Sequence, residues 1–211
     1  MTETSNPYPV TLSVDFPDRT LDRLTSFFRI IVAIPILIVI GLLVGGGREV
    51  WEGASWSIAY GAAGAVVLPT LLMILFRQKY PRWWFDWNVN LAKFGARVEA
   101  YMLLLRDEYP STDEEQAVHL EIPYPDAKQD LHRGMPLVKW LLAVPHYIVL
   151  ACLYIAVVVC VIVAWFAILF TARYPRSLFG FIVGVMRWSL RVAAYAFLLV
   201  TDRYPPFALS E

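Results

Sequence analysis

The feature that most constrains the fold is a stretch of 33 residues without a formal charge, residues 140–172. About 20 apolar residues are enough for a helix to cross the hydrocarbon core of a bilayer. Uncharged stretches at residues 30–44 and 58–76 show the same pattern earlier in the chain. Of all residues, 58% are hydrophobic, whereas soluble domains have about 45–50%. The sequence therefore predicts an all-α integral membrane protein.

The chain also contains one series of motifs twice. The matching pairs are LSVDFP at 12–17 with LEIPYP at 120–125, RIIVAIP at 29–35 with KWLLAVP at 139–145, FRQKYPR at 76–82 with FTARYPR at 170–176, and DEYP at 107–110 with DRYP at 202–205. A repeat of this length predicts two tandem copies of one folding unit. We place the first copy at residues 1–111 and the second at residues 112–211.

The first copy is longer than the second. The offset between matching motifs is about 110 residues at the start of a copy and 94 further on, so the first copy has about 16 extra residues near residues 45–57. Insertions are tolerated best in exposed loops. We therefore expect Gly45-Gly46-Gly47 and residues 48–57 to lie outside the apolar core.

Each copy is predicted to begin with a short strand and to continue with a transmembrane helix pair and an amphipathic helix. The strand prediction rests on apolar residues that alternate with polar ones, at Val10, Leu12, Val14 and Phe16, and again at Val118, Leu120, Ile122 and Tyr124. A single strand leaves its backbone groups unpaired, so we expect the strands of the two copies to pair at the membrane surface.

The second copy leaves two alternatives open, because residues 140–172 are long for one crossing and short for two. The match to the first copy favours two short helices joined by a tight turn near residues 154–158. A single, strongly tilted helix is the alternative.

Basic residues predict the orientation. With four crossings, and with both amphipathic helices on one side of the membrane, every Lys and Arg except Arg48 shares a side. Cytoplasmic loops are rich in these residues, so we expect a multi-pass protein of the cytoplasmic membrane with both termini in the cytoplasm. If the amphipathic helices also cross, there are six crossings and the copies are inverted repeats.

The two amphipathic helices carry apolar residues at alternating spacings of three and four. The stripes are Trp84, Trp87, Leu91, Phe94, Val98, Tyr101 and Leu105, and Leu178, Phe181, Val185, Trp188, Val192, Tyr195 and Leu199. Packing against other helices is the ordinary explanation of such a stripe, and burial in the bilayer interface is compatible with it.

Both amphipathic helices also carry two cations one turn apart. Like charges at this spacing are mildly unfavourable, so water, a carboxylate or an anion has to offset them. Cations beside a cytoplasmic leaflet attract anionic lipids. The candidate lipid- or anion-binding residues are these four and the arginine before each helix: Arg82, Lys93, Arg97, Arg176, Arg187 and Arg191. Snorkelling, or pairing with Asp107 and Asp202, is the alternative.

Other reactive residues give no catalytic or metal pattern. Cys152 and Cys160 are too far apart on one helix for a disulfide, and His146 is a single histidine in an apolar stretch. The acidic run at residues 113–115 is expected to be a solvated linker. We therefore predict no catalytic residues, no metal and no cofactor.

The residues that close the second copy resemble a known family. The sequence WFAILFTARYPRSLFGFIVGVMRWSLRVAAYAFLLVTDRYPPF at residues 165–207, preceded by LLAVPHYIVL at residues 141–150, is similar to a bacterial membrane-protein family known as domain of unknown function 4389. The resemblance implies a bacterial, actinobacterial-type, multi-pass protein. The first copy matches more loosely, with Gln78-Lys79, Trp83-Trp84 and the Gly-rich insertion as its departures.

These observations predict a non-enzymatic membrane protein that binds anionic lipid headgroups or organises a membrane complex. Membrane lipids are the expected partners, along with a membrane-protein partner or a second copy of the chain. Equal numbers of basic and acidic residues, 18 of each, argue against nucleic-acid binding. The alternatives are a small transporter or channel, because repeats often enclose a transport path, and an accessory subunit of a larger membrane complex.

Overall fold

The computed structural model describes residues 8–18, 20–44, 62–112 and 114–210. The elements of the first half of the chain are β1 (Thr11–Val14), α1 (Arg23–Phe27), α2 (Arg29–Val44), α3 (Ala62–Arg77) and α4 (Arg82–Met102). Those of the second half are β2 (Val118–Glu121), α5 (Met135–Leu142), α6 (Val144–Thr171) and α7 (Arg176–Ala196).

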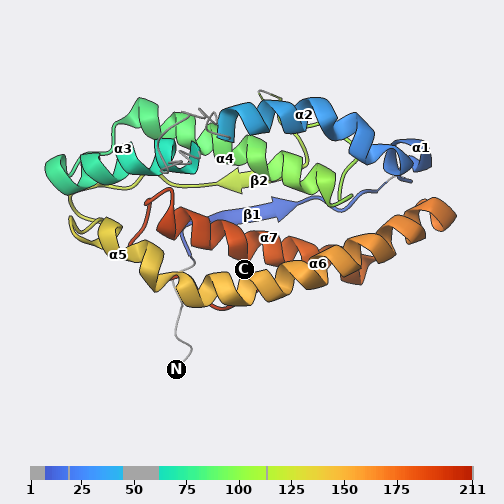
Figure 1. Cartoon of the computed structure of the whole chain (residues 1–211). Helices are drawn as coiled ribbons and strands as arrows, with labels where there is room; N and C mark the ends of the chain where they lie inside the picture. The colour runs from blue at the N-terminus through green and yellow to red at the C-terminus, as the bar shows by residue number, and fades with distance from the viewer. Residues whose placement is uncertain (1–7, 19, 45–61, 113, 211) are drawn as a thin grey trace, which may run out of the picture.

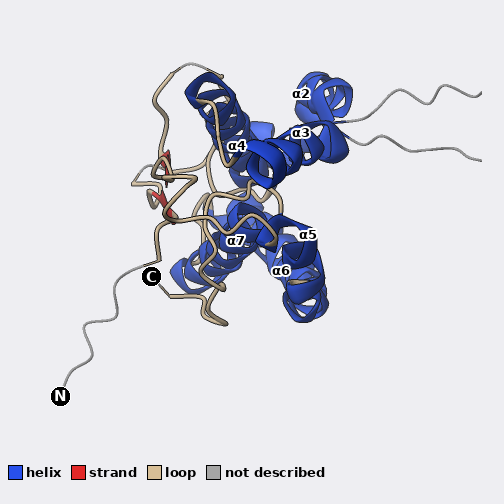
Figure 2. Cartoon of the chain, turned by 90° about the vertical axis from the view of Figure 1, so that its left-hand side faces the viewer, coloured by secondary structure: helices blue, strands red, loops and turns tan. Residues whose placement is uncertain are grey.

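These elements form three layers that run roughly alongside one another (Figure 1). Seen from the end, the strands lie on one side, α4 and α7 lie in the middle, and α2, α3, α5 and α6 lie on the other side (Figure 2). The first half and the second half face each other across the middle of the molecule, with their strands and helices pointing in opposite directions (Figure 1).

The predicted pairing of the two strands is confirmed. β1 and β2 pair antiparallel, with Leu12 opposite Leu120 and Val14 opposite Val118. These four side chains are buried against the middle layer, whereas Thr11 and Glu121 point to the solvent. The alternation in the sequence thus marks the inner face of a ribbon that neither half could form alone.

The prediction of two short helices in the second half is wrong. α6 is one continuous helix of 28 residues that passes through residues 154–158 without a turn. The sequence Tyr-Ile-Ala-Val-Val in that segment has no Gly, Pro or short polar residue that would stop a helix. In the first half, α2 and α3 follow one another along the opposite edge of the molecule (Figure 1), and the extra residues separate them. The predicted position of residues 45–57 lies outside the described residues.

Contacts in the two halves match position by position. The hydroxyl of Tyr80 donates to the carbonyl of Leu198 at 3.1 Å, and that of Tyr174 donates to the carbonyl of Leu103 at 3.2 Å. Each tyrosine belongs to the YP turn that precedes the middle helix of its own half, and each acceptor follows the middle helix of the other half. The halves are therefore joined by an exchange of equivalent hydrogen bonds.

The apolar side chains of the outer layer are mostly exposed. The large exposed residues of α2, α3 and α6 include Ile30, Ile34, Ile38, Leu68, Phe76, Ile148, Ile155, Val159, Phe166 and Phe170. Two helical stretches, Met135–Thr171 and Arg176–Ala196, are long and apolar enough to cross a membrane. The first is largely exposed and the second is more than half buried. Length and composition thus give weak evidence of membrane association.

The middle helices are buried on more than the predicted stripe. On α7, Val185 and Trp188 belong to that stripe, but Ile182 and Met186 are buried as well. The reason is that α7 packs against β1 on one side and against α6 on the other. A stripe marks only one of the two contact surfaces of a helix in a middle layer.

Candidate functional site

The six predicted binding cations do not form one patch. Arg82 and Arg176 precede the two middle helices and lie over aromatic rings of the opposite half. The guanidinium of Arg82 is 5.2 Å from the ring of Tyr124, and that of Arg176 is 4.9 Å from the ring of Phe16. Arg82 is 74% exposed and lies 3.8 Å from Asp86. A headgroup can reach such an exposed cation, which the ring beneath it holds in place.

Arg187 and Arg191 instead hold the end of the chain. Arg187 donates to the carbonyl of Leu12 at 3.0 Å and to that of Leu209 at 3.2 Å. Arg191, only 3% exposed, donates to the carbonyls of Ala208 and Ser210 at 3.3 and 2.8 Å. Backbone carbonyls thus take the place of the anion that the sequence suggested.

Gly184 makes this arrangement of the C-terminal tail, residues 207–210, sterically feasible. A Cβ atom at this position would lie 3.0 Å from the Cβ of Leu209 and 3.1 Å from its carbonyl oxygen. Any larger residue would push the tail away from α7, so the close approach depends on glycine.

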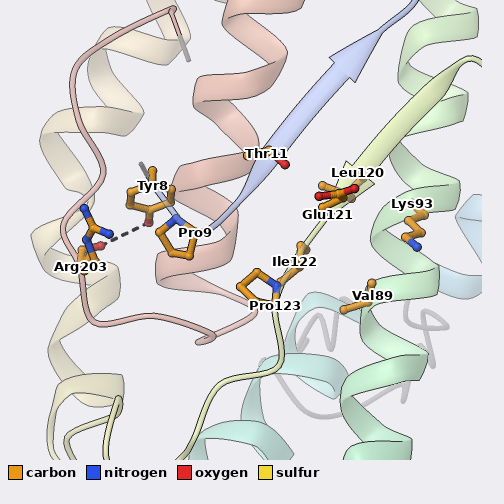
Figure 3. A pocket seen from close by; sticks show the side chains of 10 residues that line it. All are labelled: Tyr8, Pro9, Thr11, Val89, Lys93, Leu120, Glu121, Ile122, Pro123 and Arg203. Carbon is orange, nitrogen blue, oxygen red and sulfur yellow. Dashed lines mark hydrogen bonds between the residues drawn. The ribbon is translucent and has the colours of Figure 1, made fainter. Parts of the chain in front are cut away.

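Lys93 and Arg97 occupy the matching places on α4 but differ in their contacts. Arg97 donates to the carbonyl of Ser111 at 2.8 Å. Lys93 has no hydrogen-bond or ion-pair partner among the described residues. It lines a cavity of about 660 Å³ beside β2, in which Glu121 lies between Lys93 and Arg203 (Figure 3). Both signs of charge line this cavity, so it is not a simple anion site.

Sequence reasoning missed the cations that pair with Asp107 and Asp202. Asp107 forms an ion pair with Arg29, and Asp202 forms one with Lys139 at 2.7 Å. In each carboxylate the second oxygen accepts a backbone N–H, from Asp22 in the first half and from His132 in the second. We call these two arrangements the aspartate clamps.

The cations of the aspartate clamps are buried, and the clamps match closely between the halves. Arg29 is 3% exposed and Lys139 is fully buried, and the two cations lie 4.3 Å and 5.2 Å from the rings of Tyr101 and Tyr195. The signal was present in the sequence, because Arg29 and Lys139 are the first residues of a matching motif pair. The interpretation of Asp107 and Asp202 as partners of the middle-helix cations is therefore wrong.

One polar cluster lies between three helices. The hydroxyl of Tyr154 on α6 hydrogen-bonds to Glu99 of α4 at 2.9 Å and to Ser189 of α7 at 3.0 Å. Burial raises the pKa of the Glu99 carboxyl, although the hydrogen bond from Tyr154 opposes this shift. Because Ala193 occupies the matching position in the second half, the cluster is not repeated at that position.

Within the described ranges, no group of three or more His, Cys, Asp or Glu residues could hold a metal ion. The polar side chains of the clusters described above bind the chain's own backbone or other side chains of the same cluster.

Comparison with known proteins finds a family match within the second half. Residues 135–208, which span α5, α6, α7 and the first half of the tail, match the model of a family described as a domain of unknown function, DUF4389. No curated protein and no solved structure matches the chain. The match supports the resemblance for the second half, whereas a second copy in the first half stays a prediction.

Proposed function

We propose that this chain is a non-enzymatic protein that lies in one leaflet of the cytoplasmic membrane and binds anionic lipids through its basic turns. The outer layer would be immersed in the bilayer, and the β1–β2 ribbon would face the water. Its role would be to organise lipid or a membrane complex at that surface. The observation that carries the proposal is the separation of exposed apolar side chains from exposed polar ones on opposite faces of the layers.

The two faces differ sharply in chemistry. The outer layer exposes large apolar side chains along nearly its whole length, including Ile31 on α2, Leu72 on α3 and Val158 on α6. On the opposite face, Ser13, His119 and Glu121 are exposed. A contiguous apolar face of this extent is typical of a membrane or protein contact.

The direction of the helices favours an orientation in the plane of the membrane. The strands run alongside α6, α4 and α7 (Figure 1), so a crossing α6 would carry the ribbon to the depth of the hydrocarbon. Exposed strand edges and charged side chains are not tolerated at that depth. An α6 that lies in the interface leaves the ribbon in water and buries its own apolar surface.

The exposed cations lie where this orientation needs them. α3 and α6 are each followed by a basic turn before the chain enters the middle layer. These turns contain Arg77, Lys79 and Arg82 in the first half and Arg173 and Arg176 in the second, all of them exposed. Each cation near an anionic surface is worth about 1 kcal/mol. Lys93, Arg97, Arg187 and Arg191 lie closer to the ribbon and the tail, so the proposal assigns lipid binding to Arg82 and Arg176 and their neighbours.

We further infer that the two halves are copies of one unit. The exchanged tyrosine bonds and the two aspartate clamps support this inference. So does the order of the outer helices, because α2 and α3 occupy the stretch of the first half that matches α6 in the second. In this reading the four-crossing model is replaced by two copies that lie flat in the same leaflet.

Labelling of cysteines at the two ends of α5–α6 tests the orientation. In a Cys152→Ala/Cys160→Ala background, His132→Cys and Arg173→Cys are exposed to a membrane-impermeant maleimide in vesicles of known orientation. The proposal predicts that both are labelled from the same side as a Ser13→Cys control. Labelling of the two ends from opposite sides means that α6 crosses the membrane, which overturns the proposal.

A further inference from the structure

An apolar cavity opens between the two halves on the outer layer. Its volume is about 510 Å³, within the range of about 300–1,000 Å³ that small-molecule sites occupy. Phe27 and Ile30 line one wall and Ile162 and Phe166 line the other. The cavity therefore lies between α1–α2 and the second half of α6, where a lipid chain would be the neighbouring molecule in the proposed orientation.

One end of the cavity is polar. Ser26 and Arg29 both line it, and both are almost fully buried. The Ser26 hydroxyl and the Arg29 Nε have no hydrogen-bond partner among the described residues. A buried donor without a partner is costly, and here both donors belong to residues that line one apolar cavity.

The backbone around these donors is fixed. The indole N–H of Trp165 donates to the carbonyl of Ser26 at 3.2 Å, which ties α6 to α1 at this end of the cavity. The other nitrogens of Arg29 are engaged by the carbonyls of Tyr101 and Arg106 and by Asp107. The two donors are therefore held in place before any ligand arrives.

The charge balance selects the kind of ligand. Asp107 already neutralises Arg29, so an anionic ligand would bring an unmatched charge into an apolar site, which is unfavourable. An uncharged acceptor such as an ester carbonyl satisfies the donors without that cost. We propose that the cavity binds one acyl chain of an uncharged glycerolipid, with an ester carbonyl at Ser26 and Arg29.

The second half does not repeat this site. Pro136 and Trp140 occupy the positions that match Ser26 and Ile30, so the hydroxyl is missing and a larger side chain is present. In the outer layer of the first half, Leu68 of α3 occupies the position that matches Ile162 of α6. These matching positions supply control variants with the same chemistry at the other end of the molecule.

The inference rests on the proposed function only for the source of the lipid, and photolabelling in detergent tests it separately. The purified full-length chain is incubated with a diacylglycerol that carries a diazirine on one acyl chain, and labelled residues are mapped by mass spectrometry. We expect label on residues 161–166, competed by unlabelled diacylglycerol and not by oleate. Preferential competition by oleate would overturn the assignment of an uncharged ligand.

Two variants make the result specific. Ile162→Trp fills the cavity and should abolish the label, whereas Leu68→Trp should leave it unchanged. Ser26→Ala should lower the labelling yield about fivefold to tenfold, as expected for one lost hydrogen bond to a buried acceptor, and exposed Ser177→Ala should have no effect. Equal labelling in both Trp variants, or label spread evenly over α2, α3 and α6, would mean that only loosely bound lipid surrounds the helices.

The thermal stability of Ser26→Ala gives an independent check, because the substitution should raise stability without lipid but reduce the stabilisation that lipid provides. Without lipid the variant should unfold at a higher temperature than the parent chain, because it removes an unpaired buried hydroxyl. With saturating diacylglycerol the parent should gain more stability than the variant. Equal gains in both proteins contradict a role for Ser26. If the cysteine test places the ends of α6 on opposite sides but the label stays specific, the orientation fails and the lipid site stands.

Discussion

The two halves of this chain share a framework but use different surfaces. The aspartate clamps and the exchanged tyrosine bonds occur at matching positions in both. In the outer layer, the second half has the continuous 28-residue α6 where the matching stretch of the first half contains α2 and α3. On the middle helices, Arg187 and Arg191 are covered by the C-terminal tail, whereas Lys93 borders an open cavity. The shared contacts thus define the fold, and the differences mark where the halves can take separate roles.

The largest expected effect comes from breaking the clamps. Asp202→Asn leaves the fully buried Lys139 without its counter-ion and should destabilise the protein by about 3–5 kcal/mol. Asp107→Asn should cost less, about 1.5–3 kcal/mol, because Arg29 keeps two carbonyl partners. Thermal unfolding in one detergent measures both, with exposed Asp18→Asn as the control. Losses below 1 kcal/mol in both variants would show that the clamps do not hold the fold together.

The tail contact provides a second, smaller test of the difference between the halves. Gly184→Ala places a Cβ 3.0 Å from that of Leu209 and should cost about 1–3 kcal/mol through steric strain. Asn90→Ala, at the matching exposed position of α4, should change stability by less than about 0.5 kcal/mol. Protease cleavage within residues 207–210 should become faster only in the Gly184 variant. Equal cleavage in both would contradict the close fit of the tail.

The basic turns test what the halves have in common. Arg82→Gln and Arg176→Gln should each weaken binding to vesicles with anionic lipid about fivefold, equivalent to about 1 kcal/mol per charge. Flotation with anionic and with zwitterionic vesicles measures the effect, and exposed Lys128→Gln is the single-charge control. A loss as large for Lys128→Gln would point to net charge rather than to the turns.

The smallest effect should come from Glu99, whose environment exists in one half only. Burial raises the pKa of this carboxyl above its ordinary value of 4.5. At pH values between the ordinary pKa of the unfolded state and the raised pKa of the folded state, the folded state binds more protons than the unfolded state. The free energy of unfolding should therefore fall as the pH rises through this range. Glu99→Gln should remove this slope in a pH series of unfolding midpoints. An unchanged slope would assign the pH dependence to another group.

Much of the frame could be predicted from the sequence, because its signals are local. Alternation around Leu12 and Leu120 predicted the strands that form the ribbon. The continuity of α6 was missed because the comparison with the first copy suggested a break where residues 154–158 contain no helix-stopping residue. A match between two segments can therefore mislead where one of them carries extra residues.

The candidate site was harder to predict, because its partners are far apart in the chain. Asp107 binds a cation 78 residues away, and Arg187 binds a carbonyl 175 residues away. Spacing on a helix shows that Arg187 and Arg191 share a face, but it does not show that the tail folds back over that face. Only the three-dimensional structure distinguishes a headgroup from a backbone carbonyl as the partner of these cations.

The exchanged tyrosine bonds also constrain the order of events during synthesis. The acceptor of Tyr80 is synthesised 118 residues after the tyrosine itself. Likewise, β1 cannot pair until β2 has been synthesised. During synthesis, the inner surface of the first half therefore lacks its packing partner until the last helix has emerged from the ribosome. We therefore expect truncation after the first half to yield a degraded product rather than a small stable protein.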